Sequence, residues 1–174
     1  LQAKVSDGKC DILVASKKGQ SIRFSEGDVR AMGRTARGVK AMSLSSSDEV
    51  VGLEVIPKDS KMDLMVCTSK GYGKRVPVEE YRTQGRGGSG IITQKSVDKF
   101  GDLVSARGVI ETDDVVITTD QGQTIRMSCS GVSKMGRNTQ GVRLISLKSG
   151  EYVTGVALIH DDGEEEALQN IEPN

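Results

Sequence analysis

An internal repeat constrains the fold of this chain more than any other feature of its sequence. Residues 11–16 (DILVAS) are similar to residues 63–68 (DLMVCT) and 114–119 (DVVITT), so the unit returns after 52 and then 51 residues. In the same register each copy continues with a Gly turn, a second strand that carries an Arg, and a Gly-Arg pair followed by another Gly. Three elements that recur at one spacing indicate three copies of one structural unit.

The residues of each copy predict four short β-strands and almost no helix. A hairpin supplies the first two strands, alternation predicts third strands such as 39–44 and 142–147, and the fourth strands cover 50–56, 103–110 and 152–159. Because a lone small sheet cannot cover its own faces, we expect an all-β, propeller-like stack of about three four-stranded blades. The predicted limits are 1–5 for the last strand of a truncated preceding blade, 6–56, 57–110 and 111–159 for the blades, and 160–174 for a tail.

Charge is placed unevenly along the chain. Lys and Arg number 24 and Asp and Glu number 24, yet residues 160–174 hold six acidic residues and no Lys or Arg. Residues 1–159 therefore carry a formal net charge of +6. We expect the acidic tail to be disordered and solvated, and such a tail is also able to compete with nucleic acid for the basic surface of the body.

Composition excludes several classes of protein. Three widely spaced cysteines predict neither a disulfide framework nor a cysteine metal site, and no apolar run is long enough for a membrane span. Aromatic residues make up 3% of the chain, which disfavours the stacking of single-stranded bases. The single histidine, His160, follows the last predicted strand and lacks neighbours at ligand spacing. We therefore expect no catalytic residue and no metal site in this chain.

The recurrent basic residues are the candidate binding site. If the blades pack radially, a residue that recurs at one repeat position forms a row along a rim, which suits a curved polyanion such as duplex DNA. The alternative is that these side chains only protect exposed strands from edge-to-edge aggregation. The residues predicted to contact DNA are the rows Arg23, Arg75, Arg126 and Arg34, Arg86, Arg137, with the neighbouring Arg37, Lys40, Lys70, Lys74, Arg82, Lys134 and Arg143.

One stretch, Gln84-Gly85-Arg86-Gly87-Gly88-Ser89-Gly90, is unusually rich in glycine. The backbone N–H groups of such a loop can bind a phosphate, as anion-binding nests do. It is not a Walker A loop, because Gly-Lys-Ser/Thr does not follow at the required spacing. Its alternative role is a long connection in which several glycines adopt positive φ, and the two roles are compatible.

Several runs are similar to those of a known family. The Gly-Tyr-Gly-Lys-Arg run at 71–75, the Glu-Tyr-Arg run at 80–82 and the Gly-Arg-Asn-Thr-Gln-Gly-Val run at 136–142 resemble the C-terminal domain of the DNA gyrase A subunit, with the topoisomerase IV A subunit being a close relative. The resemblance implies a β-pinwheel, in which neighbouring blades exchange strands. It also implies a non-catalytic domain that wraps duplex DNA around a basic perimeter, so that the ATP-dependent parent enzyme can introduce negative supercoils.

The resemblance places other parts of the enzyme outside this chain. The gyrase box of the family is Gln-Arg-Arg-Gly-Gly-Lys-Gly, and residues 84–90 differ from it at Gly85 and Ser89, so we interpret them as a degenerate copy with the box itself upstream. The cleaving tyrosine and the use of ATP and magnesium are then expected elsewhere, with no cofactor here. The implied partners are double-stranded DNA and, in a heterotetramer, the gyrase B subunit together with the rest of the gyrase A subunit. The implied location is the bacterial cytoplasm, without a membrane.

Other functions remain open from the residues alone. A topoisomerase IV domain would select DNA geometry, and a propeller-like protein-interaction platform would need no periodic cations. An enzyme with a site in a central channel would need convergent acid, base or metal residues, which the repeats do not supply. The sequence therefore favours a DNA-wrapping module over these alternatives.

Overall fold

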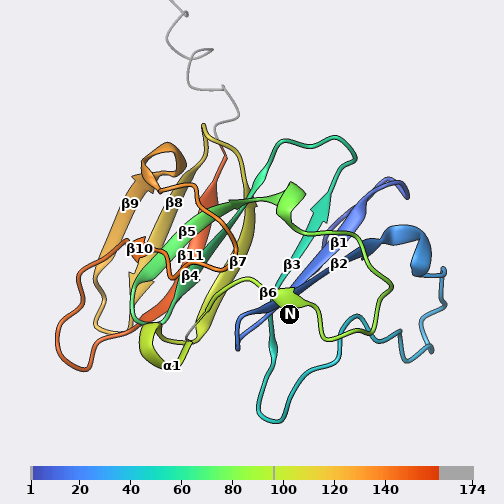
Figure 1. Cartoon of the computed structure of the whole chain (residues 1–174), viewed down its shortest axis with the longest axis horizontal. Helices are drawn as coiled ribbons and strands as arrows, with labels where there is room; N and C mark the ends of the chain where they lie inside the picture. The colour runs from blue at the N-terminus through green and yellow to red at the C-terminus, as the bar shows by residue number, and fades with distance from the viewer. Residues whose placement is uncertain (1, 96, 161–174) are drawn as a thin grey trace, which may run out of the picture.

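The structure, a computed structural model, describes residues 2–95 and 97–160. Three antiparallel sheets stand side by side, one for each repeat (Figure 1). Their strands are joined mostly by turns and irregular segments, so the fold is all-β as predicted. In the described part of the chain the helices are short: α1 (Val97–Phe100) and the 3-10 helices Glu26–Asp28, Val78–Glu80 and Cys129–Gly131.

Each sheet has the hairpin of one repeat at its centre. The first sheet has the order β3-β1-β2-β6, the second β10-β5-β4-β7 and the third β11-β8-β9. The fourth strand of each repeat pairs with the first, as in the register Leu13↔Glu54. The strand bounds are β1 Asp11–Ser16, β2 Gln20–Ser25, β3 Val50–Ile56, β4 Asp63–Thr68, β5 Tyr72–Pro77, β6 Ile91–Ile92, β7 Leu103–Val109, β8 Asp114–Thr119, β9 Thr124–Ser128, β10 Val142–Arg143 and β11 Val153–Ile159.

Neighbouring blades exchange strands. The middle repeat donates β6 to the first sheet, where Ile92 pairs with Gln20, and the third repeat donates β10 to the second sheet, where Val142 pairs with Gly73. The last strand of the first sheet and of the second sheet is therefore supplied by the next repeat along the chain. This topology confirms the β-pinwheel expected from the resemblance.

Two strand predictions are wrong and a third is too long: of the strand predicted at 142–147, only β10 (Val142–Arg143) forms. Residues 39–44 form no strand, because the equivalent strands β6 and β10 pair with the preceding repeat and the described chain has none before β1. Residues 2–5 also form no strand: the N–H of Leu53 in β3 donates to the side chain of Gln2 rather than to a backbone carbonyl. The sheets cross the predicted blade limits at β6 and β10, and the predicted tail from residue 161 onward lies outside the described residues.

The core lies between the blades and is aliphatic, as the near absence of aromatic residues requires. The cluster between the second and third sheets includes Met65, Val109 and Val115, each at most 2% exposed. Side chains of successive sheets thus cover each other's faces, which removes apolar surface from water. The cluster between the first and second sheets contains Leu13, Ala15 and Ile56 of one sheet and Leu64, Val66 and Val76 of the other.

One glycine of each repeat precedes the third strand. Gly38, Gly90 and Gly141 have φ values of +79°, +78° and +82°, a region that favours glycine. Where the strand is exchanged, the backbone also passes close to its partner: a Cβ added at Gly141 would lie 2.5 Å from the carbonyl oxygen of Gly73. A Cβ added at Gly38 would have nothing within 4 Å.

We therefore expect Gly141→Ala to destabilise the chain more than Gly38→Ala. Both substitutions place alanine at positive φ, which costs about 1–2 kcal/mol. Only Gly141→Ala also crowds the exchanged strand, at a further cost of about 1–3 kcal/mol. Urea unfolding of the two variants measures the difference, and equal losses would contradict the close approach.

Candidate nucleic-acid interface

The first predicted row of arginines is held by carboxylates. Arg23 Nε lies 2.8 Å from Asp11 Oδ2, Arg75 Nη1 lies 3.2 Å from Asp63 Oδ2, and Arg126 Nε lies 2.7 Å from Asp114 Oδ2. In every case the Asp begins the first strand of the repeat and the Arg lies on the second strand. The recurrence of Arg in this row is thus matched by a recurrent Asp.

The same arginines also bind the next blade. Arg23 Nη1 donates to the carbonyl oxygen of Val78 at 2.9 Å, and Arg75 Nε donates to that of Val132 at 2.9 Å. The side chain of Arg75 is 5% exposed and that of Arg126, which has no following blade in the described chain, is 64% exposed. The prediction that Arg75 contacts DNA is therefore wrong: its donors are buried between two blades. We call this Asp–Arg–carbonyl contact the inter-blade clamp.

Lys74 is also buried, and its assignment to a DNA contact is wrong. Its Nζ donates to the carbonyl oxygens of Gly136, Arg137 and Thr139, so it holds the loop of the next repeat. Burial lowers the pKa of Lys74 to about 8. The equivalent residues of the other repeats are Ile22 and Ile125, so this contact occurs at one junction.

The second row has a different environment. Arg86 Nη1 donates to the carbonyl of Lys40 at 3.2 Å, and Arg137 Nη1 donates to the carbonyl of Ile92 at 2.8 Å, which is the equivalent position one repeat later. Neither guanidinium forms an ion pair with a described carboxylate. A guanidinium has five N–H donors, so most donors of each remain for an external anion. Arg34, the first member of the row, is exposed.

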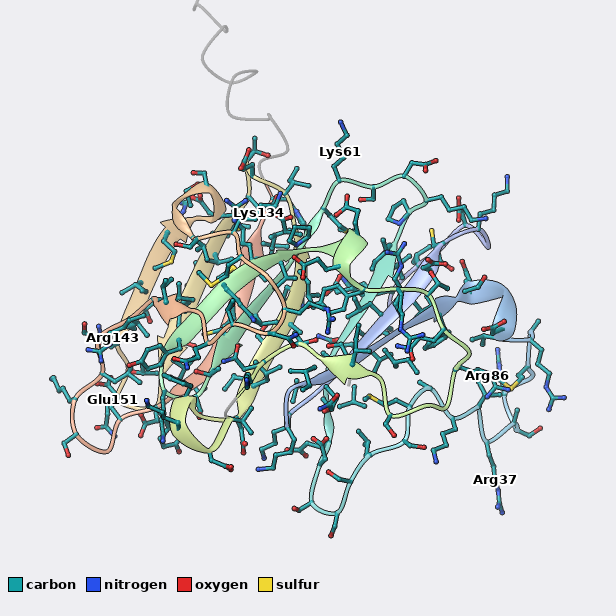
Figure 2. All side chains as sticks on the ribbon, viewed as in Figure 1. Arg37, Lys61, Arg86, Lys134, Arg143 and Glu151 are labelled. Carbon is teal, nitrogen blue, oxygen red and sulfur yellow. The ribbon has the colours of Figure 1, made fainter. Side chains whose placement is uncertain are left out.

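The other predicted contacts fall into two groups. Lys134 is exposed but lies 2.9 Å from Asp63 Oδ1, and Lys70 Nζ donates to the backbone of α1. Arg143 is exposed, with its guanidinium over the ring of Tyr72 and Nη2 3.1 Å from the hydroxyl oxygen. Figure 2 shows Arg37 and Arg143 at opposite margins of the molecule. The predicted residues that are exposed and form no ion pair with a described carboxylate are Arg34, Arg37, Lys40, Lys70, Arg82, Arg86 and Arg143.

The sequence contains a stronger signal than the two rows. Residues 29–47, 81–97 and 131–150 contain no Asp or Glu, yet they carry eleven Lys and Arg residues. We call them the acid-free segments. In the structure two of them supply the exchanged strands β6 and β10, so they cross from one blade to the next. The acid-free segments could have been found in the sequence by looking for long stretches that lack Asp and Glu, rather than by looking for recurrent Lys and Arg alone.

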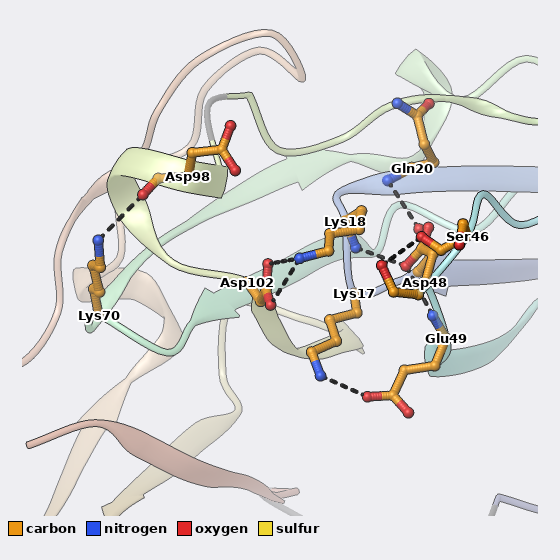
Figure 3. Close-up of polar contacts among 11 residues, drawn as sticks. Lys17, Lys18, Gln20, Ser46, Asp48, Glu49, Lys70, Asp98 and Asp102 are labelled. Carbon is orange, nitrogen blue, oxygen red and sulfur yellow. Dashed lines mark hydrogen bonds and ion pairs between the residues drawn. The ribbon is translucent and has the colours of Figure 1, made fainter.

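Apart from the buried Lys74, cations outside the acid-free segments divide into two sets. Within the described residues the set that pairs with carboxylates is Lys4, Lys17, Lys18, Arg23, Arg75, Arg107 and Arg126, whereas Lys9, Lys58, Lys61, Lys70 and Lys99 are exposed and form no such pair. Lys17 Nζ lies 2.8 Å from Glu49 Oε1, and Lys18 Nζ lies 2.9 Å from Asp102 Oδ1 (Figure 3). Both lysines belong to the turn between β1 and β2. Exposed cations without a described carboxylate partner are therefore more numerous on the acid-free segments than on the rest of the described chain.

The glycine-rich stretch 84–90 is chiefly a connection in this structure. The N–H of Gln84 donates to the carbonyl of Arg23 at 2.8 Å, and the N–H of Gly87 donates to that of Ala41 at 2.6 Å. Gly87 and Gly90 have positive φ. Two of its amides are thus used within the protein, and Arg86 is the exposed cation that it presents.

One group of side chains has the spacing of metal ligands. Ligand atoms of Asp7, Cys10 and Glu26 lie within 4.8 Å of one another. The Cys10 thiol donates a hydrogen bond to Asp7, and this contact raises the pKa of the thiol. Since a metal ligand must be a thiolate, the local chemistry favours a hydrogen-bonded turn over a metal site.

Comparison with known proteins agrees with this geometry. The family model described as "DNA gyrase C-terminal domain, beta-propeller" matches residues 11–57, 63–109 and 113–160, one match for each repeat. The chain belongs to this family. The DNA gyrase A subunit of Staphylococcus aureus (strain NCTC 8325 / PS 47) is 40% identical over 170 residues, which are 98% of this chain and 19% of that protein. The resemblance inferred from the sequence is confirmed, and the chain spans about a fifth of such relatives.

Solved structures share the pinwheel. A DNA gyrase A C-terminal domain superposes with a TM-score of 0.78 and 27% identity, over 87% of this chain and 51% of that one. The C-terminal domain of a DNA topoisomerase IV gives a TM-score of 0.86 at 18% identity, over 98% of this chain and 54% of that one. The second likeness shows the fold alone. No helix among the described residues is long and apolar enough to cross a membrane.

We expect Arg75→Met to destabilise the chain by about 3–5 kcal/mol, because it removes the buried partner of the Asp63 carboxylate and leaves it with the exposed Lys134 alone. Arg126→Met is the matched control, since it removes the same repeat position where no blade follows within the described residues. Its cost should be a small part of that of Arg75→Met. Thermal and urea unfolding measure both, and equal costs would contradict the inter-blade clamp.

Lys74 should make stability depend on pH in a definite direction. Its pKa is lowered from 10.5 to about 8 on folding, so between these values the unfolded chain binds more protons and the free energy of unfolding rises with pH. Lys74→Met removes this contribution. The variant should therefore fall further below the parent at about pH 10 than at about pH 7, by about 1–3 kcal/mol. Urea unfolding at both pH values checks it, with Lys70→Met as the exposed control.

Proposed function

We propose that this chain binds duplex DNA along its acid-free segments and bends it around the disc of blades. The observation that carries the proposal is the separation of charge. Most cations of the acid-free segments are exposed without carboxylate partners, whereas Lys17, Lys18, Arg23 and Arg75 outside them are paired. A polyanion that follows the acid-free segments meets positive charge at one blade junction after another.

Backbone recognition follows from the kind of contact available. Exposed Arg and Lys side chains bind phosphates, which position a duplex without reading its sequence. Bending 20–30 base pairs by 40–90° costs about 1–6 kcal/mol, and cations fixed on a rigid scaffold can offset that cost. The inter-blade clamp and the exchanged strands supply the rigidity. The binding is therefore expected to tolerate sequence and to favour deformable DNA.

We further infer that the domain serves a type IIA topoisomerase of the gyrase kind in the bacterial cytoplasm. Family membership and the 40% identity to a gyrase A protein support this. In this proposal the domain itself is not catalytic and wraps DNA for an assembly of gyrase A and B subunits. Strand cleavage, ATP hydrolysis and magnesium binding belong to other parts of that enzyme.

Removing two exposed cations should weaken DNA binding and its dependence on salt. Arg34→Ala combined with Arg37→Ala should lower the slope of log K against log salt by about 1.8, since each phosphate contact contributes about 0.9. Fluorescence anisotropy with a labelled duplex across a salt series measures the slope. The control is Lys17→Ala combined with Lys18→Ala, which removes equal charge from ion-paired positions and should change the slope little. Equal effects of the two pairs would refute the assignment of the interface.

Bending is tested separately from binding. A duplex labelled at both ends should show increased energy transfer when the parent chain binds, and less when Arg34 and Arg37 are replaced. Tight binding without a change in transfer would leave a DNA-binding domain that does not wrap.

A further inference from the structure

Lys74 lies against the loop of residues 136–139, which we call the Arg137 loop. Its Nζ donates to the carbonyl oxygens of Gly136 and Thr139, at 3.2 and 2.8 Å, and to that of Arg137. A fourth acceptor, the hydroxyl oxygen of Thr139, lies 3.3 Å away. An ammonium has three N–H donors, so the loop offers more acceptors than Lys74 has donors. The positive charge of Lys74 therefore shapes this loop by drawing its carbonyl oxygens inward.

Other contacts of the Arg137 loop also come from the second repeat. The N–H of Arg137 donates to Oε2 of Glu80 at 3.0 Å, and its Nη1 donates to the carbonyl oxygen of Ile92 at 2.8 Å. The position of the Arg137 guanidinium is thus set by groups on the other side of the blade junction. Among these groups Lys74 is the one that is both charged and buried, whereas Glu80 is exposed.

The equivalent loop of the second repeat, residues 85–88, rests on an apolar residue instead. Ile22 occupies the position of Lys74 in the first repeat, and a Cβ added at Gly88 would lie 3.6 Å from the Cδ1 atom of Ile22. The guanidinium that this loop presents, that of Arg86, therefore does not depend on the charge of a buried lysine. The two loops provide a comparison within one chain.

The protonation state of Lys74 decides how strongly it holds the loop. A neutral amine has two N–H donors and a lone pair, and among these acceptors the lone pair would face an oxygen atom. Burial lowers the pKa of Lys74 to about 8, so the amine is the dominant form above that pH. The charged groups that face Lys74 are Glu80, which raises its pKa, and Arg137 in the loop, which lowers it. On the neighbouring strand β4 the residue opposite Lys74 is Val66, which carries no charge.

We propose that Lys74 is a positioning residue for DNA binding: its ammonium holds the Arg137 loop in the shape that presents the Arg137 guanidinium to a phosphate, and loss of its proton weakens that contact. This inference rests on the proposed function, because it concerns one contact of the acid-free segments. The coupling is reciprocal, so a phosphate bound at Arg137 also favours the charged form of Lys74. DNA binding at this junction is sensitive to pH, whereas binding at Arg86 is not.

DNA affinity and stability should respond to pH in opposite directions. The contribution of Lys74 to the free energy of unfolding rises with pH, because the unfolded chain binds the extra proton. The affinity of the parent chain for a labelled duplex should nevertheless fall about fivefold between about pH 7 and about pH 9, which is at the low end for coupled sites. Fluorescence anisotropy at fixed salt measures this fall. Lys74→Met should remove it and show only the pH response of the other groups.

Two further variants locate the effect without altering Lys74. In Arg137→Ala the affinity should change with pH no more than in Lys74→Met, because the group that Lys74 positions is gone. In Arg86→Ala the fall of about fivefold should remain. Equal pH profiles in these two variants would overturn the proposal, and so would equal profiles in the parent chain and Lys74→Met. A parent chain that binds no duplex at about pH 7 would overturn the proposed function as well.

The order of the Arg137 loop is measured without DNA. The native cysteines are buried, so a spin label attaches selectively at the exposed position 138 in Asn138→Cys. Electron paramagnetic resonance should show a less mobile label at about pH 7 than at about pH 9, and a mobile label at both when Lys74→Met is added. A label in Ser89→Cys, beside the equivalent loop, is the control and should not respond to pH. A label at position 138 that ignores pH would overturn the proposal.

Discussion

The inter-blade clamp is the interaction on which the rest of the structure depends. In it one guanidinium joins the Asp of its own sheet to carbonyl oxygens of the next sheet, as Arg75 does between Asp63 and Val132. Burying a guanidinium is costly unless a carboxylate and further acceptors surround it. The clamp therefore forms only when two blades are in register, and it fixes the spacing at which the exchanged strands and the acid-free segments are displayed.

The basic residues divide between two tasks that look alike in the sequence. Arg23, Arg75 and Arg126 recur as regularly as Arg34, Arg86 and Arg137, but only the first set faces an Asp twelve residues earlier across a hairpin. In each hairpin the Asp and the Arg are diagonal neighbours on the two strands, since Asp11 pairs with Ser25 and Arg23 pairs with Leu13. Regular recurrence thus identifies a repeated contact, and the partner of each cation decides whether the contact is internal or external.

Much of the fold could be predicted from the repeat, and the parts that could not be predicted have physical causes. The hairpins and fourth strands could be predicted because their partners lie within one repeat. The absence of a strand at 39–44 could not be predicted, since the partner such a strand needs belongs to a preceding repeat that the described chain lacks. The burial of Lys74 could not be predicted for a related reason. Its hydrogen-bond acceptors are backbone carbonyls within residues 136–139, and a pattern of side chains in the sequence does not reveal backbone acceptors.

Strand exchange also affects how a blade resists mechanical force. The second sheet is closed by β10 of the third repeat, and the first sheet is closed by β6 of the second, so each unit is interlocked with the one after it. After a cut in a connecting loop, the pairing of the exchanged strand with its neighbour's sheet would still hold the two repeats together. A pull that a bound duplex exerts on one blade is consequently borne by the backbone hydrogen bonds of its neighbour as well, and the load is spread along the disc.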